Sequence, residues 1–306
     1  MSYFSRPYCS LTDKLHMSAL ASQFRADHLH VIDLPYRLSS WAFDEPENIR
    51  LWFDMDGQLA AWAALQTPFW TMDYACNPAD ASLHRKILSW ADERAAHLVD
   101  SAYGHPCWFV NVFASQADRI RDLEAAGFAS QADVGEDSWS KVWMRRAGQS
   151  PVKVYQPPAG FTVRPLNGEK EVEAYAELHR AVFESKNMTT DWRRRTLLHP
   201  DYRPDLDLVV ESPDGRLAAF CICWQQKRAD GSLVGQVEPL GCHKDFRPYA
   251  LGRVALSEGL RRLQLAGVQE IFLETDSYRN TAFRLYESFD FEVIQDVLVY
   301  RKDYKS

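Results

Sequence analysis

Hydrophobic residues along this chain follow two spacings, and each spacing predicts a different element of secondary structure. Apolar positions three and four residues apart, as at Leu83, Ile87 and Leu88, predict amphipathic helices, whereas alternating apolar and polar positions predict strands. The expected helices cover residues 9–26, 81–98, 116–126, 169–183, 190–198 and 251–265, and a short helix within 280–291 runs into a strand. The expected strands cover residues 49–54, 58–65, 70–76, 107–113, 129–134, 139–144, 161–166, 206–211, 217–226 and 271–275, and one more starts at Leu233. Helices and hairpin strands in this order indicate an α/β fold with a mixed sheet, and Thr12 is available to cap the first helix.

The same order of elements occurs twice, which predicts a tandem repeat. Residues 118–128 match residues 281–291, with Leu123 at the place of Tyr286. Between the halves, the sequence AGQSPVKVYQPPAG is rich in proline and glycine, as interdomain linkers are. We therefore expect a first domain at residues 1–147, a linker at 148–160 and a second domain at 161–306.

The composition is that of a globular protein in water, with 46% hydrophobic and 25% charged residues. The net charge of −7 opposes nucleic acid as a general partner, because binding to the phosphate backbone requires a cationic face. No apolar run is long enough to span a membrane and the first residues do not resemble a signal peptide, so we expect a cytoplasmic protein without a membrane partner. The six scattered cysteines fit a reducing compartment. Cys221 and Cys223 are expected to be core thiols, and no metal is expected, because no second pair of Cys or His has metal-site spacing.

The stretch from Gly235 to Leu265 combines three local signals. It has the pattern of a strand interrupted by Pro239, a loop with small residues, and a helix. Proline cannot donate to a neighbouring strand, so it indicates a bulge or an opening of the sheet. Small residues before a helix let a ligand approach free backbone N–H groups, where the helix dipole favours an anion. Arg247 and Arg253 add positive charge, and we expect a phosphorylated cofactor at the start of this helix; ordinary packing of a turn is the alternative.

This order of motifs resembles the GCN5-related N-acetyltransferase (GNAT) superfamily. Members have a strand with a V-x-P element, an R/Q-x-x-G-x-G/A loop, a helix, a strand and an N-x-x-A-x-x-L-Y-E-x-x-G-F segment. The residues assigned to the last segment are Asn280, Ala282, Leu285, Tyr286, Glu287 and Phe291. Two positions depart from the family pattern, because Ala250 replaces the first loop glycine and Asp290 replaces the glycine before Phe291. Aspartate tolerates left-handed backbone better than most residues, so the second turn remains compatible.

The resemblance implies a tandem GNAT-like fold, in which each domain has a mostly antiparallel central sheet flanked by helices. The layout is similar to that of the tandem-domain branch to which mycothiol synthases belong. Residues 77–83 of the first half contain no glycine at the place of the cofactor loop, which predicts a degenerate first domain without cofactor binding. The co-substrate implied for the second domain is acetyl-CoA.

The resemblance also assigns roles to particular residues. The cofactor-binding positions are Leu240, Gly241, Cys242, Arg247, Pro248, Tyr249, Ala250, Leu251, Gly252, Arg253 and Asn280. Backbone N–H groups near Leu240 and Cys242 are expected to polarise the acyl carbonyl. Tyr286 is expected to give a proton to the leaving thiolate of coenzyme A; a core tyrosine and, for Asn280, a simple helix cap are the structural alternatives.

A general base is required because an amine is protonated near neutral pH and must lose a proton before it attacks a thioester. Glu238 is the candidate, since it is an acidic residue in an apolar strand just before the expected opening. A water on Gln236, where relatives have a glutamate, and His243 are the alternatives, and a structural role for Glu238 also remains open. An acyl-enzyme on Cys242 is possible chemistry, but direct transfer is the habit of the family.

The leading hypothesis is an N-acetyltransferase that moves an acetyl group from acetyl-CoA to an amine of a small molecule or peptide. The alternative is a non-catalytic acyl-CoA-binding or interaction protein with a GNAT fold. A dinucleotide oxidoreductase is disfavoured, because no G-x-G-x-x-G follows a strand with an acidic residue about 20 positions later. The pattern leaves the acceptor, the acyl chain and the choice between monomer and homodimer open.

Overall fold

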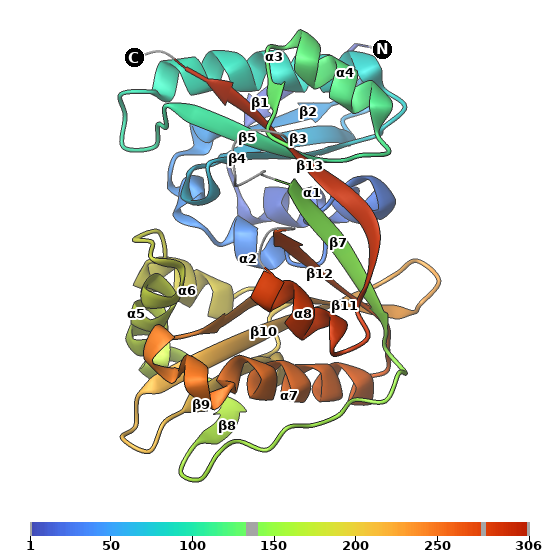
Figure 1. Ribbon diagram of the computed structural model, residues 1–306. Coiled ribbons are helices and arrows are strands. Elements are labelled where there is room, and N and C mark those ends of the chain that lie inside the picture. Colours follow the sequence, from blue (N-terminus) through green and yellow to red (C-terminus); the bar gives the residue numbers. More distant parts are fainter. Residues whose placement is uncertain (1, 133–139, 277–279, 305–306) are drawn as a thin grey trace. The chain divides into compact units, whose positions relative to one another are not determined.

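A computed structural model describes residues 2–132, 140–276 and 280–304 of the chain (Figure 1). Contacts among residues group them into two compact units. The first unit contains the chain up to Val142 and the C-terminal stretch from Gln295; the second contains Trp143–Thr275 and the residues up to Ile294. These units differ from the expected ranges 1–147 and 161–306 at the C-terminus, because Val297 to Asp303 of the last strand pair with a strand of the first unit.

The first unit is a sheet covered by helices. Its elements are β1 (Phe4–Pro7), α1 (Leu11–Gln23), α2 (Leu34–Leu38), β2 (Ile49–Phe53), β3 (Leu59–Gln66), β4 (Thr71–Cys76), α3 (Ala81–Leu98), β5 (Cys107–Phe113), α4 (Ala117–Ala125), β6 (Ala129–Ser130) and the later part of β13 (Glu292–Asp303). The strand order is β1-β2-β3-β4-β5-β13, and β6 also pairs with β13. All of these pairs are antiparallel except β4 with β5, which run parallel. Part of the expected strands 129–134 and 139–144 lies outside the described residues.

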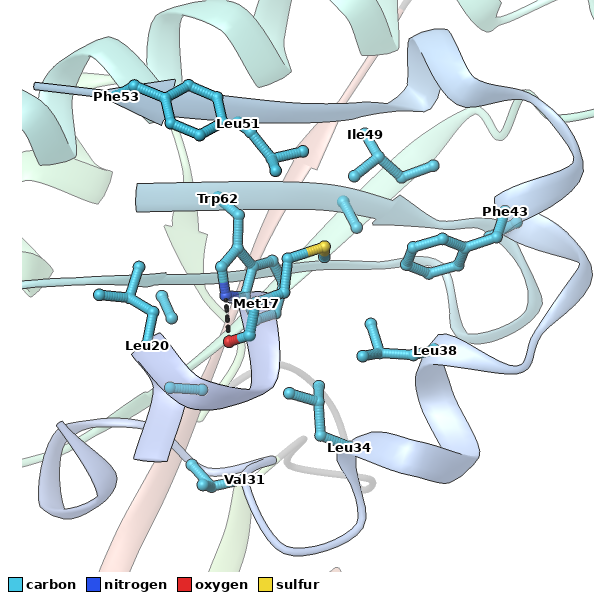
Figure 2. Close-up of a cluster of buried hydrophobic side chains, with 14 residues drawn as sticks. Met17, Leu20, Val31, Leu34, Leu38, Phe43, Ile49, Leu51, Phe53 and Trp62 are labelled. Carbon is cyan, nitrogen blue, oxygen red and sulfur yellow. Dashed lines mark hydrogen bonds between the residues drawn. The ribbon is translucent and has the colours of Figure 1, made fainter. Parts of the chain in front are cut away.

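The strand β3 shows why the two faces of this sheet are both buried. Successive side chains of a strand point to opposite faces. Trp62 and Ala64 pack with residues of α1 and α2, whereas Ala61 and Ala63 pack with residues of α3. Figure 2 shows the first of these clusters, in which the indole of Trp62 donates a 2.9 Å hydrogen bond to the backbone oxygen of Met17.

The first helix differs from the expectation at its cap. α1 begins at Leu11 with Ser10 as N-cap, and the Ser10 hydroxyl accepts from the backbone N–H of Asp13. The expected cap Thr12 is therefore wrong, because residue 12 already lies inside the first turn. None of the helices in the described part of the chain combines the length and hydrophobicity that a membrane span requires.

The second unit is also a sheet with helices. Its elements are β7 (Ser140–Ala147), β8 (Thr162–Pro165), α5 (Val172–Phe183), α6 (Thr190–Leu197), β9 (Asp207–Glu211), β10 (Leu217–Lys227), β11 (Leu233–Cys242), α7 (Leu251–Leu265), β12 (Val268–Asp276) and α8 (Asn280–Glu287). The strand order is β7-β12-β11-β10-β9-β8. β8, β9, β10 and β11 pair antiparallel in turn, and β11 and β12 pair parallel. This mixed sheet with flanking helices agrees with the expected fold class.

The helix α7 packs on β10 and β11 at two glycines. A side chain at Gly259 of α7 would meet the sulfur atoms of Cys223 and Cys221 at 2.8 and 3.1 Å, and one at Gly235 of β11 would meet Leu263 of α7 at 3.2 Å. The two thiols are fully buried and point to the same face of β10. The expectation that they are core thiols is thus confirmed.

The proline-rich segment after β7 is attached to the second unit. Described residues 148–161 form neither helix nor strand. The backbone oxygen of Ser150 accepts from Arg146 at 2.7 Å and from Gln264 of α7 at 2.9 Å, and the N–H of Tyr155 donates to Ser257 of α7. The segment therefore follows α7 and brings its own side chains to that helix.

Candidate functional site

The sheet of the second unit contains a bulge at the proline, as the sequence predicts. Between β10 and β11, Cys223 pairs with Val237 and Cys221 pairs with Leu240. Glu238 and Pro239 together therefore lie opposite one residue of β10, which is the definition of a β-bulge. The peptide bond between Glu238 and Pro239 is cis.

β11 parts from β12 at the same place. The parallel register between them runs from Leu233–Val268 to Gln236–Phe272, although β11 continues to Cys242 and β12 to Asp276. Beyond Gln236, β11 is paired with β10 on one side and has no pairing with β12 among the described residues. The predicted opening of the sheet therefore starts one residue before the bulge.

Glu238 is held at this opening by its backbone. Its carbonyl oxygen accepts a 2.7 Å hydrogen bond from the indole Nε1–H of the buried Trp224 on β10. The side chain is half-buried. Burial, together with the charges of Asp207 and Glu238, raises the pKa of the Tyr175 hydroxyl above its usual range. The Glu238 carboxylate is thus close enough to α5 to affect a phenol of that helix.

The two alternative bases have different environments. Gln236 is fully buried, and neither atom of its side-chain amide has a hydrogen-bond partner among the described residues. His243 caps the short 3-10 helix Lys244–Tyr249, because its Nδ1 accepts from the backbone N–H of Asp245 at 3.3 Å. His243 therefore has a structural task, while the amide of Gln236 retains its full hydrogen-bonding capacity.

The chain from the end of β11 to α7 forms the expected turn into a helix. In β11, Leu240 is half-buried and Gly241 is buried. A Cβ atom at Gly241 would lie within 2.6 Å of the side chains of Phe220 and Val182, so a larger residue has no space there. Arg247, Pro248 and Tyr249 are exposed in the 3-10 helix. The chain thus presents an exposed cationic side chain one turn before α7.

Ala250 links this turn to α7 in a left-handed conformation, with φ +53° and ψ +32°. Glycine is the residue that takes such angles without a steric cost, which explains the family preference at this position. Asp290 has the same property, with φ +60°, at the second departure from the family pattern. Both turns therefore adopt the left-handed backbone conformation that glycine favours, although the residue present is not glycine.

The N-terminus of α7 has no side-chain cap. Ala250 cannot accept a hydrogen bond through its side chain, and the first turn contains no acidic residue. Leu251 is buried, whereas Gly252 and Arg253 are half-buried. The N–H of Arg253 already donates to the backbone oxygen of Ala250 at 3.0 Å, but the positive end of this 15-residue helix has no side-chain cap and therefore favours an anion. The residues present therefore fit the pyrophosphate that the sequence predicted.

The thiol of Cys242 lies against this helix start. A side chain at Gly252 would meet Cβ of Cys242 at 3.9 Å. Burial raises the pKa of Cys242, and this effect outweighs the opposing effects of the Gly252 N–H group and of Arg247. The thiol is thus protonated near neutral pH, which disfavours it as a nucleophile.

The segment 148–160 contributes residues that the sequence analysis did not assign to the site. The guanidinium of Arg253 lies over the ring of Tyr155 at 5.3 Å, and the ammonium of Lys153 lies over the same ring at 5.0 Å. The nearby positive charges, first that of Arg253 and then that of Lys153, lower the pKa of the Tyr155 hydroxyl. Two cations therefore gather beside the start of α7. The sequence shows that Lys153 is present, but its position beside α7 depends on the path of an irregular segment.

Tyr286 lies on α8 and is 9% exposed, with its ring edge-on to Phe291 at 6.1 Å. Asn280 is the first residue of α8, and its side chain lies outside the described part of the structure. One correction concerns its register. The family pattern has two residues between asparagine and alanine, but Asn280 and Ala282 are separated by one, so the family asparagine corresponds to position 279. Residue 279 lies outside the described residues.

Comparisons with known proteins bear on the second half and on the fold. Residues 172–291 match the model of the acetyltransferase (GNAT) family. A mycothiol acetyltransferase from Kineococcus radiotolerans is 37% identical over 150 residues, which cover 47% of this chain and 47% of that protein. The chain therefore matches about half the length of this relative.

Two solved structures resemble the chain over almost its whole length. The tandem GNAT protein from the clavulanic acid biosynthesis pathway has a TM-score of 0.66 at 12% identity, covering 100% of this chain and 99% of that one. A GCN5-related N-acetyltransferase from Sphaerobacter thermophilus has a TM-score of 0.64 at 19% identity, covering 99% and 96%. At such low identity these likenesses show the fold alone. They confirm the expected tandem GNAT-like architecture.

Proposed function

We propose that this chain, whose residues 172–291 match the GNAT family model, transfers an acetyl group from acetyl-CoA to a primary amine of a small molecule. The observation that carries the proposal is the parting of β11 and β12 next to the uncapped start of α7. An open strand edge is followed along the chain by an uncapped helix N-terminus. The strand edge suits the carbonyl end of an elongated substrate, and the helix start suits a pyrophosphate at its other end.

The residues of the second unit divide the binding of acetyl-CoA between them. Backbone groups of Gly252 and Arg253, with the charge of Arg247, are proposed to hold the pyrophosphate. The open edge of β11 at Leu240, Gly241 and Cys242 is proposed to accept the pantetheine arm and polarise the acyl carbonyl. Asn280 is the first residue of α8 and remains a proposed cofactor contact. No part of this assignment requires a metal ion.

Two side chains are proposed to move protons. Glu238 takes a proton from the ammonium form of the acceptor, because its residue is half-buried in the strand where β11 parts from β12. The free amine attacks the acetyl carbonyl, and Tyr286 protonates the thiolate that leaves. The protonated state of the Cys242 thiol supports direct transfer over an acyl-cysteine.

The first unit is proposed to be a degenerate domain without a cofactor site, consistent with the expected range 1–147. Asp80 is the N-cap of α3, and its carboxylate accepts a 2.9 Å hydrogen bond from the N–H of Leu83 and a 2.5 Å hydrogen bond from the hydroxyl of Tyr3. A carboxylate already occupying the positive end of that helix would repel a pyrophosphate. α7 has no such group, which supports placing the transfer reaction in the range 161–306.

The name of one relative guides the choice of acceptors to test. Since the matched curated relative is named a mycothiol acetyltransferase, an amino-sugar thiol is the first acceptor to test, followed by other small amines. Purified protein is expected to release coenzyme A only when acetyl-CoA and a suitable amine are both present. No turnover with any amine and no binding of acetyl-CoA would reject the proposal.

The non-catalytic alternative is favoured by Ala250 at the place of the first loop glycine and by Gln236, whose neutral amide cannot itself take a proton from the acceptor. Replacement of Tyr286 by Phe separates the two functions. An enzyme should lose turnover by about 10²- to 10⁴-fold while its Kd for acetyl-CoA stays unchanged, because only proton transfer is removed. A sensor would show no turnover to lose. Tyr300→Phe, on β13, is the matched control that should leave turnover unchanged.

A further inference from the structure

The irregular segment between β7 and β8 is fixed against the second unit and carries two residues to the start of α7. Near its beginning, the N–H of Gly148 donates to a backbone oxygen of β12 at 2.7 Å. Further along, the N–H of Tyr155 donates to the hydroxyl of Ser257 at 3.1 Å, and the ring of Tyr155 lies edge-on to Phe289 at 5.8 Å. The path of the backbone around Lys153 and Tyr155 is therefore set by contacts, although the segment forms neither helix nor strand.

Two cations lie over the ring of Tyr155. The ammonium of Lys153 is 5.0 Å from the ring centroid, and the guanidinium of Arg253 is 5.3 Å from it. Each cation is attracted to the ring, but the two positive charges repel each other. Neither side chain forms an ion pair with a carboxylate in the part of the chain that the structure describes. The cluster of Lys153, Tyr155 and Arg253 therefore carries two positive charges without an anion to balance them.

The position of Arg253 makes this arrangement unfavourable for the protein alone. Arg253 lies in the first turn of α7, where the helix dipole disfavours a cation, and that turn contains no acidic residue. Later in the same helix, Arg261 and Arg262 each bind Glu258 at 2.7 Å. The chain has 42 acidic and 35 basic residues, so carboxylates are not scarce. A bound anion would lower the free energy of the cluster, and the described residues provide none there.

The cluster is open to a ligand. Lys153 is exposed, and Tyr155 and Arg253 are partly exposed. The backbone at the same helix start is proposed to hold a pyrophosphate, so a second anion of the same ligand can reach these side chains. Coenzyme A has such an anion, because its ribose carries a phosphate monoester on the 3′ oxygen. Near neutral pH this group has a charge of about −1.5 to −2 and three acceptor oxygens.

We propose that Lys153, Tyr155 and Arg253 form a subsite for the 3′-phosphate of coenzyme A. The Lys153 ammonium and the Arg253 guanidinium pair with the phosphate oxygens, and the Tyr155 ring holds both cations in position. The backbone of Arg253 remains with the pyrophosphate, whereas its side chain binds the monoester. This inference rests on the proposed use of acetyl-CoA, and it adds a contact at the end of the ligand opposite the thioester. The protein is then selective for coenzyme A over the 3′-dephospho form.

The test compares the Kd values of coenzyme A and 3′-dephospho-coenzyme A, measured by isothermal titration calorimetry at one ionic strength. Wild type should bind coenzyme A about tenfold more tightly, because the charge-assisted hydrogen bonds to the monoester are lost in the dephospho form. Lys153→Gln should weaken the binding of coenzyme A by about five- to tenfold and leave that of the dephospho form within about twofold. Tyr155→Leu, which keeps an apolar side chain against Phe289, should have the same selective effect.

Lys227→Gln is the matched control, because Lys227 is an exposed lysine of the same unit at the end of β10. It should leave both Kd values unchanged. Equal Kd values of the two ligands in wild type would overturn the subsite and leave the proposed function in place. A Lys153→Gln variant that weakens both ligands equally would also overturn it, since the lysine would then serve the pyrophosphate. Binding of neither ligand would reject the proposed function itself and the subsite with it.

Discussion

The indole of Trp224 and the backbone of Glu238 are joined by a 2.7 Å hydrogen bond across β10 and β11. This contact holds the bulged peptide at the point where β11 leaves β12. Trp224 is 2% exposed, so water cannot replace the bond. The position of the proposed base therefore depends on a side chain of the neighbouring strand.

Replacing Trp224 by Phe should destabilise the second unit by about 1–3 kcal/mol, because the partly buried carbonyl of Glu238 loses its donor. The proposed kcat should fall more than the affinity for acetyl-CoA, since Glu238 is displaced and the helix start is not. Urea denaturation and steady-state kinetics measure the two effects. Trp108→Phe is the control, because Trp108 is as buried but its Nε1 has no hydrogen-bond partner among the described residues. Equal losses in both variants would contradict the role of the hydrogen bond.

Ala250 provides a second prediction at the start of α7. Its φ of +53° costs a non-glycine residue roughly 1–2 kcal/mol of folding free energy. Glycine avoids this steric cost, but it loses more conformational entropy on folding, which cancels part of the gain. Ala250→Gly should therefore stabilise the protein by about 0.5–1 kcal/mol and leave the helix start equally open to acetyl-CoA. Ala266→Gly at the other end of α7, where φ is −75°, should instead destabilise it by about 0.5–1 kcal/mol. A loss of stability in both variants would show that Ala250 carries no strain.

The Cys242 thiol predicts a pH dependence of alkylation. Burial raises its pKa above the ordinary value of 9.0. Only the thiolate reacts, so the rate with iodoacetamide should rise about tenfold for each pH unit from 7 to 9 without reaching a plateau. A Cys9→Ser background removes the exposed cysteine, and acetyl-CoA should protect Cys242. A plateau below pH 9 would contradict the raised pKa.

The same residue separates direct transfer from an acyl-enzyme. Cys242→Ser should keep turnover within a few-fold of wild type, because the proposed nucleophile is the amine of the acceptor. A loss of 100-fold or more, with acetyl-CoA binding intact, would favour the covalent route instead.

His179 of α5 predicts part of the acid sensitivity of the second unit. It is 8% exposed and stacks on Phe220 at 5.7 Å. Burial, reinforced by the charges of Arg193 and Arg180, lowers its pKa from 6.5 to about 3. Between these values the unfolded chain binds a proton that the folded protein excludes. Stability should therefore fall as the pH drops from 6.5 towards 3, by up to about 1.4 kcal/mol per unit.

His179→Phe removes this group and retains a ring of similar shape. Compared with wild type, its urea midpoint should fall less between pH 6 and pH 4, while the difference at pH 8 reports packing alone. Identical pH profiles for the two proteins would show that His179 is protonated in the folded state.

The sequence by itself determined the elements, the repeat and the bulge. Periodicity of apolar residues decides which faces are buried, and Pro239 cannot donate to a ladder, so these features depend on local chemistry. The site motif could be read for the same reason, since Tyr286 and the loop before α7 lie in short contiguous segments. Asn280 stands one residue closer to Ala282 than in the family pattern, and its contact with a cofactor remains a prediction.

Only the tertiary structure decided which residues distant in sequence share an environment. Nothing near Glu238 in the sequence points to Trp224, and nothing near Arg253 points to Lys153 on an irregular segment. The last residues of β13 belong to the first unit because strand pairing is non-local and depends on the whole sheet.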